Sequence, residues 1–160
     1  MPIPADFESE SLYSPEAWFI HDVLDIDVDA QVVRVAIDTE KLGPLVDAQR
    51  VLPSHPKHFP GAVAIQVTGT LGQLHAIYVL GLRPSEGWGG FGASIRRARF
   101  PNIGHIGPEV TATCTASRVR HVNGTYHVTY EFRFEQDGSV IYESTQTSAW
   151  FRAAAVVEST

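Results

Sequence analysis

The stretch HPKHFPGAVAIQVTGTLGQLHAIYVL, residues 55–80, decides the fold. Apolar side chains in its second part recur at steps of three and four residues: Val63, Val67, Leu71, Leu74 and Tyr78. This spacing predicts one helix over about residues 62–80. The loop before it carries two histidines among prolines, and imidazole transfers protons near neutral pH. Because a helix start leaves backbone N–H groups free to hold a carbonyl oxygen, the stretch indicates chemistry on a carbonyl or thioester.

Strand patterns lie on both sides of this helix. Upstream, β-branched residues between positions 19 and 37 favour strands around a turn at 27–30. Downstream, the period changes to two, and strands are expected over about residues 90–100, 109–120, 125–135 and 139–151. Asn-Gly at 123–124 and Asp-Gly at 137–138 are typical of tight hairpins, so the last strands should form an antiparallel meander.

The remaining segments complete a single-domain prediction. Residues 1–13 are polar and proline-rich and are expected to form a loose N-terminal arm, and residues 38–61 are expected to form an irregular loop. The length of 160 residues fits one domain over 1–160. The order of the elements predicts an α+β fold: strands, a long loop, one buried helix and a meander.

Composition narrows the classes of function. The formal net charge of −6 argues against a nucleic-acid partner. The single cysteine, Cys114, excludes an internal disulfide and any cysteine-based zinc site, and we expect it in the core. The polar residues within 62–80 make the helix a poor membrane span, and the first residues lack a signal-peptide pattern, so a cytoplasmic location is expected.

The order of elements, together with His58-Phe59-Pro60-Gly61, resembles the hot-dog fold, in which a curved antiparallel sheet wraps one long helix. Within it, the motif is most similar to that of the β-hydroxyacyl-acyl-carrier-protein dehydratases. The resemblance implies a substrate linked to phosphopantetheine or coenzyme A, delivered by an acyl carrier protein or as an acyl-CoA. It also implies a homodimer or a larger dimer-based assembly, and no metal or redox cofactor.

The resemblance assigns catalytic roles residue by residue. His58 or His55 would be the catalytic base or hydrogen-bond donor, depending on where the loop is shortened. The acidic residue that the family carries in the first turns of the helix is missing, because 62–80 holds no Asp or Glu, and Gln66 takes its place. Three functions follow: dehydratase-like chemistry, thioester hydrolysis as in hot-dog thioesterases, and acyl binding without catalysis.

The expected substrate contacts lie around the helix start and in a glycine-rich segment. Backbone N–H groups of Gly61, Ala62 and Val63 would hold the thioester oxygen. Three further residues are expected to contact the acyl group, with packing as the alternative for the two aromatic ones: Thr70, Trp88 and Phe91. The two loop histidines find no third ligand at a useful spacing, so no metal site is expected.

Overall fold

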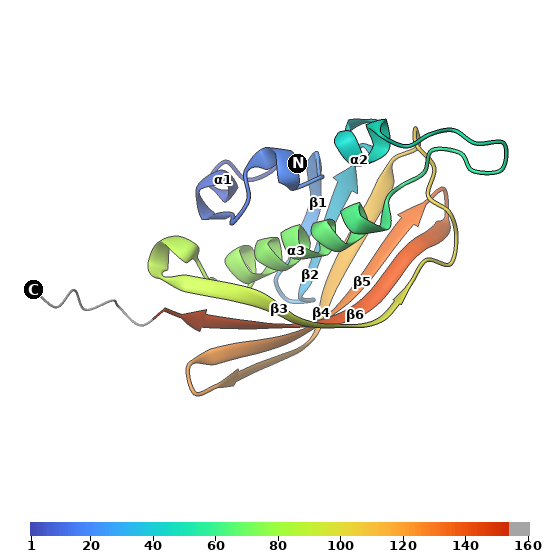
Figure 1. The fold of residues 1–160 in the computed structure, drawn as a ribbon. Coiled ribbons are helices and arrows are strands. Elements are labelled where there is room, and N and C mark those ends of the chain that lie inside the picture. The colour runs from blue at the N-terminus through green and yellow to red at the C-terminus, as the bar shows by residue number, and fades with distance from the viewer. Residues whose placement is uncertain (154–160) are drawn as a thin grey trace, which may run out of the picture.

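The computed structural model describes residues 1–153, and Figure 1 shows an antiparallel sheet curved around one long helix. The strands are β1 (Asp22–Asp27), β2 (Val32–Ile37), β3 (Trp88–Arg99), β4 (Val110–Val122), β5 (Thr125–Gln136) and β6 (Ser139–Arg152). The helices are α1 (Phe7–Glu10), α2 (Pro44–Asp47) and α3 (Gly61–Tyr78), and the 3-10 turns are η1 (Pro15–Ala17), η2 (Thr39–Lys41) and η3 (Pro84–Glu86). The predicted α+β hot-dog architecture is confirmed.

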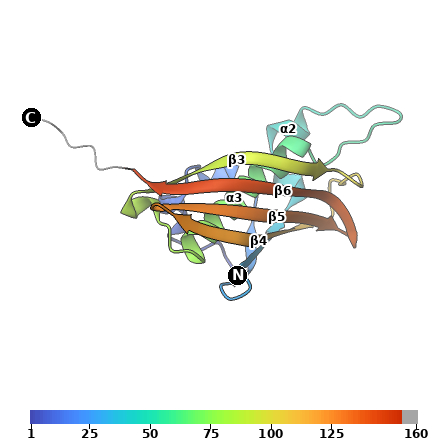
Figure 2. The same cartoon turned by 90° about the horizontal axis from the view of Figure 1, so that it is seen from below.

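The sheet has six strands in the order β1-β2-β4-β5-β6-β3, and every neighbouring pair is antiparallel. Figure 2 shows β4, β5, β6 and β3 side by side. Both predicted hairpin turns carry the positive φ angles that a tight turn of this kind requires, 50° and 77° at 123–124 and 49° and 77° at 137–138. The meander is therefore fixed by its turns. β1 and β3 form the two edges of the sheet.

The long helix has one face in the core and one face outside it. Val63, Val67 and Leu71 are fully buried against the sheet, where each large apolar side chain contributes about 1.5–3 kcal/mol. On the other side, Ile65 and Gly69 are exposed. The sheet of this one chain therefore covers α3 on one side only. No helix within residues 1–153 is long and apolar enough to span a membrane.

The inner positions of the meander complete the core. Phe132, Phe134 and Tyr142 are buried, and Cys114 is fully enclosed, as the alternating pattern predicted. Burial raises the pKa of the Cys114 thiol well above its usual range. The thiolate, which is the reactive form, is therefore disfavoured, and Cys114 serves as a small core residue.

The first thirteen residues correct one expectation. We expected a loose arm over 1–13, but Phe7 is fully buried, and its ring lies 4.8 Å from that of Trp18. Glu10 is also buried and accepts hydrogen bonds from the Ser85 hydroxyl at 2.6 Å and the Ser85 N–H at 2.9 Å. One aromatic anchor and one carboxylate thus fix a segment whose overall polarity suggested mobility.

Candidate functional site

The loop that carries His58 is held on both sides by backbone hydrogen bonds. The Gln49 side chain accepts from the His58 N–H and donates to the His58 carbonyl oxygen, both at 2.8 Å. The next residue, Phe59, donates its N–H to the Gly104 carbonyl oxygen at 2.8 Å. Two distant segments therefore set the position of His58 at the start of α3.

The imidazoles of His58 and His55 are stacked, with ring centroids 4.9 Å apart and an angle of 18° between the rings. His58 Nδ1 lies 3.3 Å from the Pro56 carbonyl oxygen. A carbonyl oxygen only accepts hydrogen bonds, so in a neutral ring this contact places the proton on Nδ1 and leaves the lone pair on Nε2. The two histidines that the sequence offers as alternatives for the catalytic role therefore lie side by side.

The N-terminus of α3 opens beside these rings. Pro60 is the N-cap residue, and no side chain among the described residues caps the helix there. The N–H groups of Gly61, Ala62 and Val63 are those that a helix leaves without partners inside it, and the helix dipole makes this end favourable for negative charge. His55, His58 and Gly61 line a hollow of about 470 Å³ here, together with residues 100–104.

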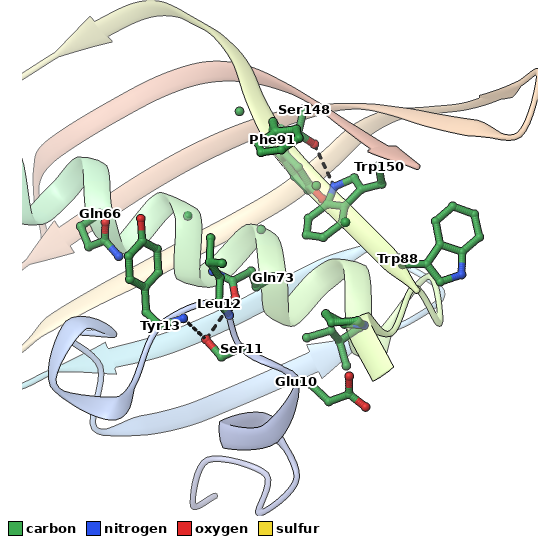
Figure 3. Close-up of a pocket in the computed structure, with 18 of the residues that line it drawn as sticks. Glu10, Ser11, Leu12, Tyr13, Gln66, Gln73, Trp88, Phe91, Ser148 and Trp150 are labelled. Atoms are coloured by element: carbon green, nitrogen blue, oxygen red, sulfur yellow. Dashed lines mark hydrogen bonds between the residues drawn. The ribbon is translucent and has the colours of Figure 1, made fainter. Parts of the chain in front are cut away.

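A second, larger cavity of about 620 Å³ lies along α3, between this helix, β3 and residues 9–13 (Figure 3). Three of the predicted site residues line it: Gln66, Trp88 and Phe91. The Phe91 ring itself packs on that of Phe151, 5.6 Å away, and stays 66% exposed, so Phe91 lies at the rim. The predicted site is thus divided between two cavities on the same helix.

One predicted contact is not available for substrate. Thr70 is fully buried, and its hydroxyl donates to the Trp18 carbonyl oxygen at 3.2 Å, so its role is structural. The side chain of Val63 is in the core, and the contact predicted for this residue is that of its backbone N–H. Gln66 Nε2 donates to the Ala17 carbonyl oxygen at 3.2 Å, which orients this amide at the near end of the larger cavity.

Two residues that shape the larger cavity carry no signal of that role in the sequence. Gln73 Oε1 accepts from the Leu12 N–H at 2.9 Å and from the Ser11 hydroxyl at 3.1 Å, so it fastens residues 11–12 over the cavity. Tyr130 also lines the cavity, and its hydroxyl lies 3.2 Å from Nδ1 of the buried His75. The strict alternation of β5 placed Tyr130 on the inner face but could not indicate a cavity there.

Acidic groups are scarce around both cavities. Within residues 1–153, no Asp or Glu lines the hollow at His58 or lies in α3. Glu10 lines the larger cavity, but its hydrogen bonds to Ser85 and its contact with Arg83 lower its pKa, so the carboxylate stays ionised near neutral pH. In the same part of the chain no three histidine, cysteine or acidic side chains are grouped to hold a metal ion. The groups available for catalysis at the hollow are therefore imidazole and backbone N–H groups.

Comparison with known proteins supports the fold. No family model and no curated protein matches the sequence. Among solved structures, a mutant thioesterase PA1618 from Pseudomonas aeruginosa is 15% identical, covers 96% of each chain and has a TM-score of 0.63. The thioesterase HI1161 from Haemophilus influenzae is 16% identical over 95% of this chain and 92% of its own, with a TM-score of 0.60. The PaaI protein of the E. coli phenylacetic acid degradation operon is 16% identical over 83% and 79%, with a TM-score of 0.53.

Proposed function

From the hot-dog fold that the chain shares with these thioesterases, we propose that it hydrolyses acyl thioesters of the acyl-CoA type. The observation that carries the proposal is the uncapped start of α3 beside His58, open to the hollow of about 470 Å³. The hollow is large enough for a thioester group. The similar solved structures include thioesterases of this fold. Their sequence identity to this chain is low and shows a shared fold alone.

The proposed reaction uses only water and the groups at the helix start. The thioester oxygen lies against the N–H groups of Gly61, Ala62 and Val63, which stabilise the negative charge of the tetrahedral intermediate. His58 Nε2 takes a proton from water as the water oxygen attacks the carbonyl carbon. The C–S bond then breaks, the imidazolium returns the proton to sulfur, and the acid and the thiol leave. No cofactor beyond the thiol carrier of the substrate is required.

Hydrolysis is favoured over dehydration because of the missing acid. Dehydration of a 3-hydroxyacyl thioester needs a base for the α-proton and an acid for the leaving hydroxyl group. His58 can supply the base, but the described residues lining its hollow include no carboxyl group. Gln66, which stands where the dehydratases carry their acid, cannot transfer a proton. Thioester hydrolysis needs no such second group. Because the motif at 58–61 resembles that of the dehydratases, dehydration is the alternative to be tested.

We propose in addition that the working form is a homodimer paired along β3. β3 is an edge strand of twelve residues that pairs with β6 on one side only. Ile95 on this strand and Ile65 on the uncovered face of α3 are 48% and 43% exposed. Proteins protect an unpaired edge of this length with charges, with bulges or by covering it with another chain. A second copy would cover both features and enclose the two cavities.

The test measures products directly. The protein is incubated with decanoyl-CoA and with 3-hydroxydecanoyl-CoA, and the products are followed by mass spectrometry and by release of free thiol. The proposal predicts free acid and thiol from both substrates. Loss of water from the hydroxyacyl substrate without thiol release would establish dehydration instead, and binding without turnover would establish an acyl-binding protein.

A matched pair of variants locates the reaction. Replacing His58 by Gln should lower kcat by about 10²–10⁴-fold, the usual contribution of a general base, with an unchanged circular dichroism spectrum. His105→Gln is the control, because His105 pairs with His58 through the backbone but does not line the hollow. Equal activity of the two variants would remove His58 from the mechanism.

A further inference from the structure

The wall of the larger cavity is rich in aromatic rings, and two of its polar groups are hydrogen-bonded to neighbours. Tyr13, Tyr130 and Trp150 contribute to the wall, and Figure 3 shows the first and last of these with Gln66 and Gln73 of α3. Trp150 Nε1 donates to the Ser148 hydroxyl at 3.1 Å, and the Tyr130 hydroxyl bonds to His75. At Tyr130 and Trp150, an occupant would therefore meet the faces and edges of the rings.

Glycines open the cavity where neither packing nor backbone conformation requires them. A Cβ on Gly69 of α3 would meet nothing within 4 Å, and the same holds for Gly89 and Gly92 on β3. Gly90 differs, because its Cβ would lie 2.3 Å from the Trp150 ring. Gly69 has no positive φ, and glycine is disfavoured inside a helix. The missing side chain of Gly69 therefore provides space inside the cavity.

The distance between the two cavities sets a requirement on the occupant. Gln66, at the near end of the larger cavity, lies five residues beyond Gly61, which is about 7.5 Å along an α-helix. An acetyl group attached to a thioester at the helix start would end before the cavity. A short alkyl spacer bridges this distance and delivers the group at its far end into the aromatic walls.

Resting on the proposed thioester hydrolysis, we infer that the larger cavity receives the ring of an aryl-alkanoyl group, and that Gly69 is the residue that admits it. Aromatic rings gain from edge-to-face and offset contacts with other rings beyond the area they bury. A linear acyl chain with the same number of carbons as the aryl-alkanoyl group gains binding free energy only from the apolar area that it buries. The cavity of about 620 Å³ has room for a ring and its spacer.

The closing experiment compares acyl groups of equal carbon number. Wild-type kcat/KM is measured for 4-phenylbutanoyl-CoA and decanoyl-CoA, with acetyl-CoA as the short reference. We expect 4-phenylbutanoyl-CoA to exceed decanoyl-CoA by about fivefold, the size of an aromatic pair contribution. Gly69→Leu should lower the value for 4-phenylbutanoyl-CoA by about tenfold or more while changing that for acetyl-CoA by less than about twofold. Gly69→Ala, which favours the helix, should act in the same direction with a smaller effect.

The control and a second readout separate the two proposals. Ala48→Leu adds similar bulk at an exposed position that lines neither cavity, and should leave the ratio between substrates unchanged. An equal loss for all three substrates in Gly69→Leu, or a preference for decanoyl-CoA, would overturn the inference and leave thioester hydrolysis intact. If no thioester is hydrolysed, binding of 4-phenylbutyrate is measured by saturation-transfer NMR. Binding that Gly69→Leu abolishes supports a ring site in the larger cavity of a protein that is not a thioesterase. Binding that Gly69→Leu leaves unchanged overturns both the ring site and thioester hydrolysis.

Discussion

Phe100 lays its ring over the start of α3, so that the ring carbon Cζ lies 3.0 Å from where a Cβ on Gly61 would stand. Phe100 is 54% exposed, and the centroid of its ring lies 5.1 Å from that of the Tyr142 ring. Only a glycine at this position leaves the ring undisturbed. The segment after β3 and the first residue of α3 are therefore coupled at the hollow where the thioester is proposed to bind.

This coupling predicts a non-additive pair of mutations. Gly61→Ala gains helix propensity, at most about 1 kcal/mol at this first helical position, but must push the Phe100 ring aside in the wild-type background. In a Phe100→Ala background the obstruction is gone, so Gly61→Ala should be more favourable there by at least about 0.5 kcal/mol. Urea unfolding of the four proteins of the cycle measures the coupling. Additive effects would mean that the ring moves without cost.

The buried His75 should make stability depend on pH. Burial lowers its pKa to about 4 from the ordinary value of 6.5, while Tyr130 and Gln31 contact its two ring nitrogens. Between these two values the unfolded chain binds the proton and the folded chain does not, so stability is full above pH 6.5 and falls as the pH drops toward 4. The expected loss from His75 between pH 7 and pH 5 is about 2 kcal/mol.

The measurement compares the wild type with His75→Gln by urea unfolding at pH 7 and pH 5. Glutamine keeps hydrogen-bonding capacity but does not titrate in this range, so the variant should be less stable at pH 7 and show a flatter pH dependence. The other histidines are common to both proteins and cancel in the difference. Parallel pH curves would show that His75 binds its proton equally in the folded and unfolded states.

The N-terminal segment should contribute to stability through one residue. Phe7→Ala removes a fully buried ring from the core and should destabilise the protein by about 3–5 kcal/mol. Leu12→Ala, at a position that is 75% exposed, should change stability by less than about 0.5 kcal/mol. Thermal unfolding of both variants checks this, and similar melting temperatures would restore the idea of a loose arm.

Much of the fold follows from local pattern. The period of two over β5, the two hairpin turns and the helical spacing of Val63, Val67 and Leu71 each fix an element through nearest neighbours in sequence. Burial on one face then dictates how the elements pack. Phe7 escaped prediction because its burial depends on contacts with Trp18 and the end of α3, and no periodicity exists in a four-residue helix.

The candidate site was harder to predict for a related reason. His58 and Gly61 are neighbours in sequence, and local spacing was sufficient to bring them together. Thr70 has the helical spacing of a site residue, yet only the tertiary contact with Trp18 shows that it is buried. The cavity at Gly69 depends on β3 and on residues 9–13, which are far apart in the chain and reach α3 only in the folded state.

The proposed pairing along β3 predicts that a single charge on this edge prevents dimerisation. Ile95→Lys places an ammonium group on the exposed strand, the device by which sheet edges avoid pairing, and should convert the wild-type dimer to a monomer without loss of folded structure. Val119→Lys is the control, because Val119 lies on β4, a strand with a neighbour on each side, and is 37% exposed.

Size-exclusion chromatography with light scattering gives the mass of each protein, and thioester hydrolysis is measured on the same samples. We expect activity to fall together with the dimer, because in the proposed dimer the second copy would enclose both cavities. A wild-type protein that is monomeric and fully active at every concentration would contradict the pairing.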